Sequence, residues 1–148
     1  MRFMLIVKAN ADTETGSMPS RELIEEMGRY NEELMKAGVL LAADGLHPSS
    51  RGARVLFSGD KRTVVDGPFA ETKELIAGFW LIPVGSRDEA IEWVKRCPNP
   101  TRGESAIEIR PVSEPEALSA PFTPAARASE ARTRPQRPSQ EQPRRRRP

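Results

Sequence analysis

Strand-like and helix-like segments follow one another in a definite order along the first 112 residues, and this order constrains the fold more than any other feature. Short segments rich in Val, Ile, Leu and Phe predict strands, whereas apolar residues that recur every three or four positions predict helices. The predicted strands span residues 2–8, 39–43, 54–58, 62–65, 75–84 and 106–112, and the predicted helices span residues 19–38 and 86–97. The order β-α-β-β-β-β-α-β predicts an α+β domain of the ferredoxin-like type, with two helices on one face of a mainly antiparallel sheet and an inserted hairpin.

Local signals place the ends of both predicted helices. Pro19 and Ser20 suit the start of the first helix, because Pro is tolerated in the first turn and Ser caps free backbone N–H groups. Gly38 is typical of a helix end, and Ser86 with Glu89 forms a capping-box pattern at the start of the second helix. The first helix is expected to bury one apolar face, made of Leu23, Ile24, Met27, Leu34 and Met35.

The two helices can cover only one face of such a sheet. The opposite face must be polar, line a ligand cleft or pack against a second subunit. The sequence pattern leaves these three alternatives open.

The periodic pattern ends after Val112, and residues 113–148 are rich in Pro, Ala, Ser, Arg and Gln. Such a composition buries too little apolar surface to offset the entropy of ordering, so we expect one domain over residues 1–112 and a disordered tail over residues 113–148. Residues 111–148 carry 8 Arg and 4 Glu, whereas residues 1–110 carry 15 basic and 17 acidic side chains. The tail could contact nucleic acid weakly, but no aromatic residues lie among its last arginines, so a solvated appendage is favoured.

Cysteine and histidine are too scarce to support several large classes of protein. The single cysteine, Cys97, cannot form an intrachain disulfide or a Cys-rich zinc site, and we expect it to be a buried structural residue. The sequence contains no Gly-rich phosphate loop, no Gly-x-Ser-x-Gly motif and no Cys-x-x-Cys, and its carboxylates show no metal-ligand spacing. We therefore expect no metal, no organic cofactor, no membrane span and a cytoplasmic location. Trp80 and Trp93 are expected in the core or at a subunit interface.

The densest group of functional side chains follows the predicted strand at residues 62–65. Asp66 lies at the strand exit, where Pro68 fixes a sharp turn and the carboxylate can accept backbone N–H groups. One interpretation is therefore a purely structural turn. The other is a site, in which Asp66 acts as a base or an orienting carboxylate and Phe69, Glu71 and Lys73 contact the substrate.

His47 is the single histidine of the chain and lies in a polar segment before Pro48. A lone histidine in such a segment is commonly just solvated. In the functional interpretation His47 carries a proton and Asp66 orients it, because both residues lie near the ends of predicted strands.

The run VDGPFAETKE at residues 65–74 strongly resembles the signature of DGPF-domain proteins, a branch of the YCII-related family. Further matching segments are residues 36–40, 45–48, 78–81, 89–93, 96–98 and 107–111, so that the resemblance covers residues 1–112. It implies a ferredoxin-like fold that pairs as a homodimer of the dimeric α+β barrel type, with a cleft near the subunit interface.

The family's proposed catalytic pair is not present at its usual positions. The family's His lies early in the first helix, where this chain has residues 19–22 without histidine, and its Asp follows the second helix, where this chain has residues 97–99. Asp66 and His47 are therefore candidates from position alone. The branch also tends to be encoded beside extracytoplasmic-function sigma factors.

Two hypotheses follow from the sequence. The first is a cofactor-independent enzyme that performs an elimination or isomerisation on a small molecule by acid–base chemistry near Asp66. The second is a non-catalytic dimeric module that binds a ligand or a protein and is linked to sigma-factor regulation.

Overall fold

The central element of the molecule is a four-stranded antiparallel sheet with the spatial order β2-β5-β1-β6. The computed structural model of the chain describes residues 1–70, 72–114 and 124–133. The sheet strands are β1 (Arg2–Lys8), β2 (Ala42–Gly45), β5 (Ile76–Pro83) and β6 (Ile107–Pro111). When the inserted hairpin is left out, the sheet has the strand order of a ferredoxin-like α+β domain, and the predicted fold class is confirmed.

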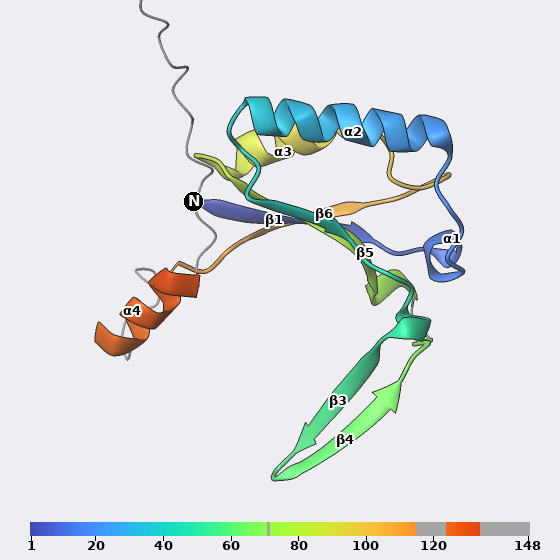
Figure 1. Cartoon of the computed structure of the whole chain (residues 1–148), viewed down its shortest axis with the longest axis vertical. Helices are drawn as coiled ribbons and strands as arrows, with labels where there is room; N and C mark the ends of the chain where they lie inside the picture. The colour runs from blue at the N-terminus through green and yellow to red at the C-terminus, as the bar shows by residue number, and fades with distance from the viewer. Residues whose placement is uncertain (71, 115–123, 134–148) are drawn as a thin grey trace, which may run out of the picture.

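Two helices, α2 (Arg21–Lys36) and α3 (Arg87–Lys95), lie together on one face of the sheet (Figure 1). Both begin as the sequence predicts, because the Ser20 hydroxyl accepts the Leu23 N–H and the Ser86 hydroxyl accepts the Glu89 N–H. A short helix, α1 (Ala11–Glu14), lies in the segment between β1 and α2.

The hydrophobic core lies between these helices and the sheet. Alternate residues of β1 point toward the helices, and the partner positions on β5 share that face, so that Leu5 lies opposite Trp80. The α2 face differs from the predicted one, because Tyr30 is buried whereas Ile24 and Met35 are exposed. Residues spaced by four and three positions along α2 form the buried stripe, and Ile24 and Met35 lie beside it.

The predicted hairpin forms a separate two-stranded sheet, β3 (Ala53–Ser58) with β4 (Lys61–Asp66). It extends away from the body of the domain (Figure 1), and all of its residues are exposed. A two-stranded ribbon without a covered face is at best marginally stable in water. Its position therefore needs an anchor at its base.

Two features of the strands, the start of β2 and the position of Pro83 in β5, have local reasons. β2 begins at Ala42 rather than residue 39, because the Val39 N–H still bonds the Leu34 carbonyl at the end of α2. β5 is a central strand, and Pro83 lies beyond the last residue that pairs with β2. The missing N–H of Pro83 therefore costs no ladder hydrogen bond on that side.

The chain after β6 stays in contact with β1 for a few residues. The Val112 N–H donates to the Arg2 carbonyl, and the Arg2 guanidinium pairs with Glu114 at 3.2 Å. Residues 124–133 form helix α4 (Pro124–Thr133), which the composition of the tail does not predict. The rest of the predicted disordered tail, residues 115–123 and 134–148, lies outside the described residues.

Candidate functional site

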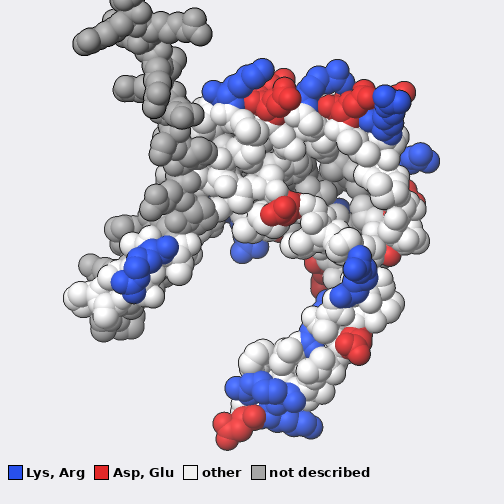
Figure 2. All heavy atoms as spheres, viewed as in Figure 1, with Lys and Arg blue, Asp and Glu red and all other residues white. Residues whose placement is uncertain are grey.

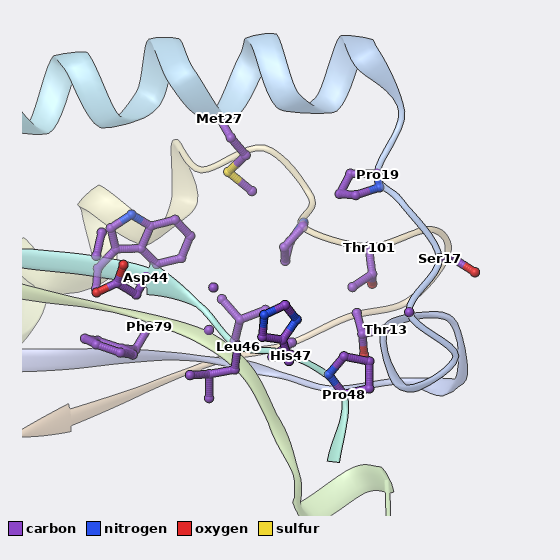
Figure 3. A pocket seen from close by; sticks show the side chains of 18 of the residues that line it. Thr13, Ser17, Pro19, Met27, Asp44, Leu46, His47, Pro48, Phe79 and Thr101 are labelled. Carbon is purple, nitrogen blue, oxygen red and sulfur yellow. The ribbon is translucent and has the colours of Figure 1, made fainter. Parts of the chain in front are cut away.

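The main candidate site is a cavity of about 440 Å³ under the N-terminal half of α2, called the α2 cavity below. It is bounded by α2, by the adjoining ends of β2 and β5, by the segment between α1 and α2, and by the loop after α3 (Figure 3). Its lining includes Thr13, Ser17, Pro19, Met27, Asn31, Asp44, Leu46, His47, Pro48, Phe79, Trp80 and Thr101. Most of this lining is apolar, as is usual for sites that bind small organic molecules.

One wall of the α2 cavity is fixed by a buried aromatic pair. The Trp80 indole N–H donates to the Asn31 side-chain oxygen at 2.8 Å, and the Trp80 and Tyr30 rings meet edge to face at 5.7 Å. Tyr30 in turn donates its hydroxyl to the Trp93 carbonyl at 2.9 Å. Because each polar end of these rings has a partner, the wall is rigid.

His47 lies on the opposite side of the hollow from Met27 (Figure 3). The segment that carries His47 leaves the sheet with the Leu46 N–H bonded to the Ala77 carbonyl at 2.8 Å. This bond ties the start of the segment to β5, and the exposed side chain of His47 lies among the residues that line the largely apolar cavity.

Thr101 contributes a hydroxyl that has no hydrogen-bond partner among the residues that the structure describes. Its Oγ1 is buried, and the side chain lies in the wall between the α2 cavity and a second cavity of about 440 Å³ beside the start of α2. A buried hydroxyl without a partner carries a desolvation cost.

We expect Thr101→Val to raise the free energy of unfolding by about 1 kcal/mol, because the change removes this unpaired hydroxyl and nearly keeps the shape of the side chain. Urea unfolding of the wild type and the variant measures the difference. A loss of stability would show that the hydroxyl has a partner in solution. Thr13→Val is the contrasting change, because the Thr13 hydroxyl accepts the Asn10 N–H at 2.9 Å, and we expect it to destabilise.

The Asp66–Phe69 turn is built as an anchor for the hairpin. The Gly67 N–H donates to the Gly52 carbonyl at 3.0 Å, across the base of the ribbon. A Cβ atom at Gly67 would overlap the Ser49 carbonyl, so the two backbone segments approach as closely as only glycine allows.

Ser49 links this turn to the body of the domain. Its hydroxyl accepts the Phe69 N–H at 3.1 Å and donates to the Glu14 carboxylate, which also accepts the Ser49 N–H at 3.1 Å. The Phe69 ring lies under the Arg54 guanidinium, 3.9 Å from its centroid. The contact between Phe69 and Arg54 thus joins side chains at the base of the hairpin, where hydrogen bonds already hold the backbone.

The structure does not gather the residues proposed from the sequence into one site. His47 lines the α2 cavity, whereas Asp66 ends β4 as an exposed residue and does not line that cavity. Within the described part of the chain, no hydrogen bond joins His47 to Asp66. Lys73 is exposed in a short 3₁₀ turn (Thr72–Glu74), and Glu71 lies outside the described residues.

The cavity instead brings in residues that the sequence pattern does not mark as functional. The sequence pattern indicates only that Asn31 is a polar residue of an amphipathic helix and that Trp80 is a core residue. Thr101 lies in a loop that follows two prolines. In the described part of the chain, a hydrogen bond links Asn31 to Trp80, and the Thr101 hydroxyl lacks a partner. These two features mark the residues as parts of a site, and both arise only when the chain folds.

Cys97 lies between α3 and the loop after it, and it is half-buried. Burial raises the pKa of its thiol from 9.0 to about 12, and the S–H lies 3.2 Å from the Pro98 carbonyl. The thiolate is the reactive form, so Cys97 is a structural residue rather than a nucleophile near neutral pH.

At pH 8 a thiol reagent should modify Cys97 at least about 100-fold more slowly in the folded chain than in the unfolded chain.

Because the raised pKa keeps the native thiol of Cys97 protonated, the free energy of unfolding is retained below pH 9.0 and falls as the pH rises from 9.0 toward about 12. Burial also raises the pKa of Tyr30, which adds to this alkaline loss. Cys97→Ala should remove part of the pH dependence, and an unchanged profile would contradict the shift.

Residues 1–115 match the YCII-related domain, and the chain belongs to that family. An uncharacterised protein of Rhizobium meliloti (strain 1021) is 32% identical over 91 residues, which cover 62% of this chain and 73% of that protein. Assignment to the DGPF branch stays a prediction. Within the described residues, no helix is both long and apolar enough to cross a membrane.

Proposed function

We propose that this protein binds a small, mainly apolar molecule in the α2 cavity and performs acid–base chemistry on it, an elimination or an isomerisation, with His47 as the group that transfers the proton. The observation that carries the proposal is the position of the single imidazole at an otherwise largely apolar cavity. Histidine is the side chain most often used as a general acid or base in catalysis. No metal or organic cofactor is part of the proposal.

The resemblance gives independent support for this cavity. The two positions at which it places the family's His and Asp are residues 19–22 and 97–99. Pro19 lines the α2 cavity, and Asn99 lines the second cavity that shares the Thr101 wall. Asp66 has no role in the proposed chemistry, because it lies at the anchor of the hairpin.

The test uses the full chain with Trp93→Phe, which leaves Trp80 as the single tryptophan. A metabolite library is screened by Trp80 fluorescence and by thermal shift, and each ligand found is assayed for turnover by NMR. With His47→Gln we expect binding to stay within about threefold and turnover to fall at least about 100-fold. A ligand that stabilises the chain without changing Trp80 fluorescence would contradict the site, and full turnover by His47→Gln would contradict the chemistry.

We further propose that the partner of the hairpin is a second copy of this chain. Apolar residues are exposed along the ribbon, with Phe57 72%, Val64 66% and Leu56 51% exposed, while charged side chains gather at its tip (Figure 2). The sheet face away from the helices carries Met4 and Ile6, which are only half-buried. The two apolar surfaces together favour the homodimer that the resemblance implies.

The regulatory alternative, a non-catalytic module linked to extracytoplasmic-function sigma factors, rests on the resemblance alone. Ligand binding without turnover in the experiment above would favour it. The cytoplasmic location also stays a prediction from the sequence.

A further inference from the structure

Arg51 ends the short 3₁₀ turn Ser49–Arg51 and places its guanidinium against His47. Its Nη1 atom lies 3.2 Å from Nδ1 and 3.3 Å from Nε2 of the imidazole. The lone pair or N–H bond of each ring nitrogen points outward in the plane of the imidazole, and these two directions diverge. One N–H group of Arg51 therefore cannot form a good hydrogen bond with both nitrogens. The guanidinium therefore lies against the ring, and in the described part of the chain no hydrogen bond uses its other donors.

Arg51 also differs from the other arginines that make contacts in the described part of the chain. Arg2, Arg21 and Arg110 pair with carboxylates. Arg54, Arg62 and Arg96 lie over aromatic rings outside the α2 cavity. Arg51 makes no ion pair within the described residues, and the side chain it contacts lines the cavity.

Acidic residues lie on two sides of the α2 cavity. Its acidic lining residue, Asp44, lies to the left of His47 in Figure 3. The second cavity, beyond Thr101, is lined by three acidic residues, Asp12, Glu22 and Glu26, and by one basic residue, Arg102. A negative group on a ligand is thus repelled by both of these regions and attracted to Arg51, which lies against His47 at the margin of the cavity.

We propose that the ligand of the α2 cavity has an oxyanion head group, a carboxylate or a phosphate, which Arg51 binds beside His47, while its apolar body lies against Met27 and Trp80. This inference rests on the proposed function. The planar guanidinium matches both oxyanions through paired N–H groups, and the apolar lining matches the rest of the molecule. The head group sets the orientation, so that the atoms next to it lie at the imidazole.

The experiment compares four probes of similar size in the full chain with Trp93→Phe: 3-phenylpropionate, its neutral amide, 2-phenylethyl phosphate and 2-phenylethylamine. Trp80 fluorescence reports the affinity of each. We expect at least one of the two anions to bind tenfold or more tightly than the amide, the amine to bind most weakly, and the preference to shrink as salt is added. The stronger anion identifies the head group.

Arg51→Gln should abolish the preference for the anion while changing the affinity of the amide by less than about twofold. Arg54→Gln is the matched control, because Arg54 is an exposed arginine outside the cavity, and it should keep the preference. Equal binding of anion and amide, retention of the preference in Arg51→Gln, or its loss in Arg54→Gln would overturn the inference.

Failure of this inference can be told apart from failure of the proposed function. If none of the four probes changes Trp80 fluorescence, the head-group inference is overturned. The proposed function is tested separately, by the response of Trp80 fluorescence to the wider library and by the turnover of His47→Gln.

Discussion

Gly67→Ala should lower the free energy of unfolding by about 3 kcal/mol and displace the hairpin from the body of the domain. The reason is steric, because a Cβ atom at this position would overlap the Ser49 carbonyl. That carbonyl belongs to backbone rather than to a flexible side chain, so relief requires movement of a whole segment. Any such movement also breaks the Gly67 N–H bond to Gly52 and strains the hydrogen bond between Phe69 and Ser49.

Two other glycines provide graded controls for this change. Gly28 lies in α2, where an added Cβ would meet no atom within 4 Å, so Gly28→Ala should stabilise by about 0.5–1 kcal/mol through helix propensity. Gly78→Ala meets the Asp44 carbonyl at 2.9 Å and should fall between the two. Urea unfolding of the three variants gives the order, and a Gly67→Ala variant as stable as the wild type would contradict the anchor.

Phe57→Glu should weaken self-association at least about 100-fold, which corresponds to about 2.7 kcal/mol. Phe57 is exposed in the single chain and has the Arg62 guanidinium 4.5 Å above its ring, so it supports little within its own subunit. In the proposed homodimer its ring becomes buried, and a carboxylate there would lose its hydration and the apolar contact with the partner, which pairing with Arg62 of its own subunit offsets only in part. Sedimentation velocity over a range of concentrations measures the dissociation constant.

Ile24→Glu is the matched control for this second prediction. Ile24 is an apolar residue on α2 that is 52% exposed, and it lies outside the hairpin. Its replacement should leave the dissociation constant within about twofold. A wild-type chain that sediments as a monomer at all concentrations, or a Phe57→Glu variant that still associates, would contradict the homodimer.

The order of the elements could be predicted because each signal lies within a few neighbouring residues. Ser20 and Ser86 mark the helix starts, and the apolar segments mark the strands, so the α+β class follows from local chemistry. The boundary of β2 could not be predicted in this way. It depends on the hydrogen bond between Val39 and Leu34, which exists only once α2 has formed its last turn.

The candidate site was harder to predict, because its residues come from separate parts of the chain. His47 stands out as the only histidine, but its position opposite Met27 depends on how α2 crosses the sheet. Trp80 and Thr101 reach the same cavity from β5 and from the loop after α3. Composition and spacing carry no information on such contacts.

The turn around Asp66 shows the converse difficulty. Charged residues beside an apolar Phe69 resemble a reactive site, yet the main constraint on this segment is the close approach of Gly67 to Ser49. The Glu14 carboxylate that completes the anchor lies more than 50 residues earlier in the chain. A motif can thus be distinctive because of backbone packing as well as because of chemistry.

The claim that the α2 cavity is the ligand site is tested most directly by isothermal titration calorimetry of a ligand from the Trp80 screen. The titration compares the wild type, Ala43→Leu and Asp66→Ala. Ala43 lines the cavity and lies opposite Trp80 in the sheet, so a larger side chain there occupies the space of the ligand. We predict a loss of affinity of at least tenfold for Ala43→Leu and a change of less than about twofold for Asp66→Ala. The opposite pattern, with binding kept in Ala43→Leu and lost in Asp66→Ala, would place the site at the Asp66 turn and contradict this account.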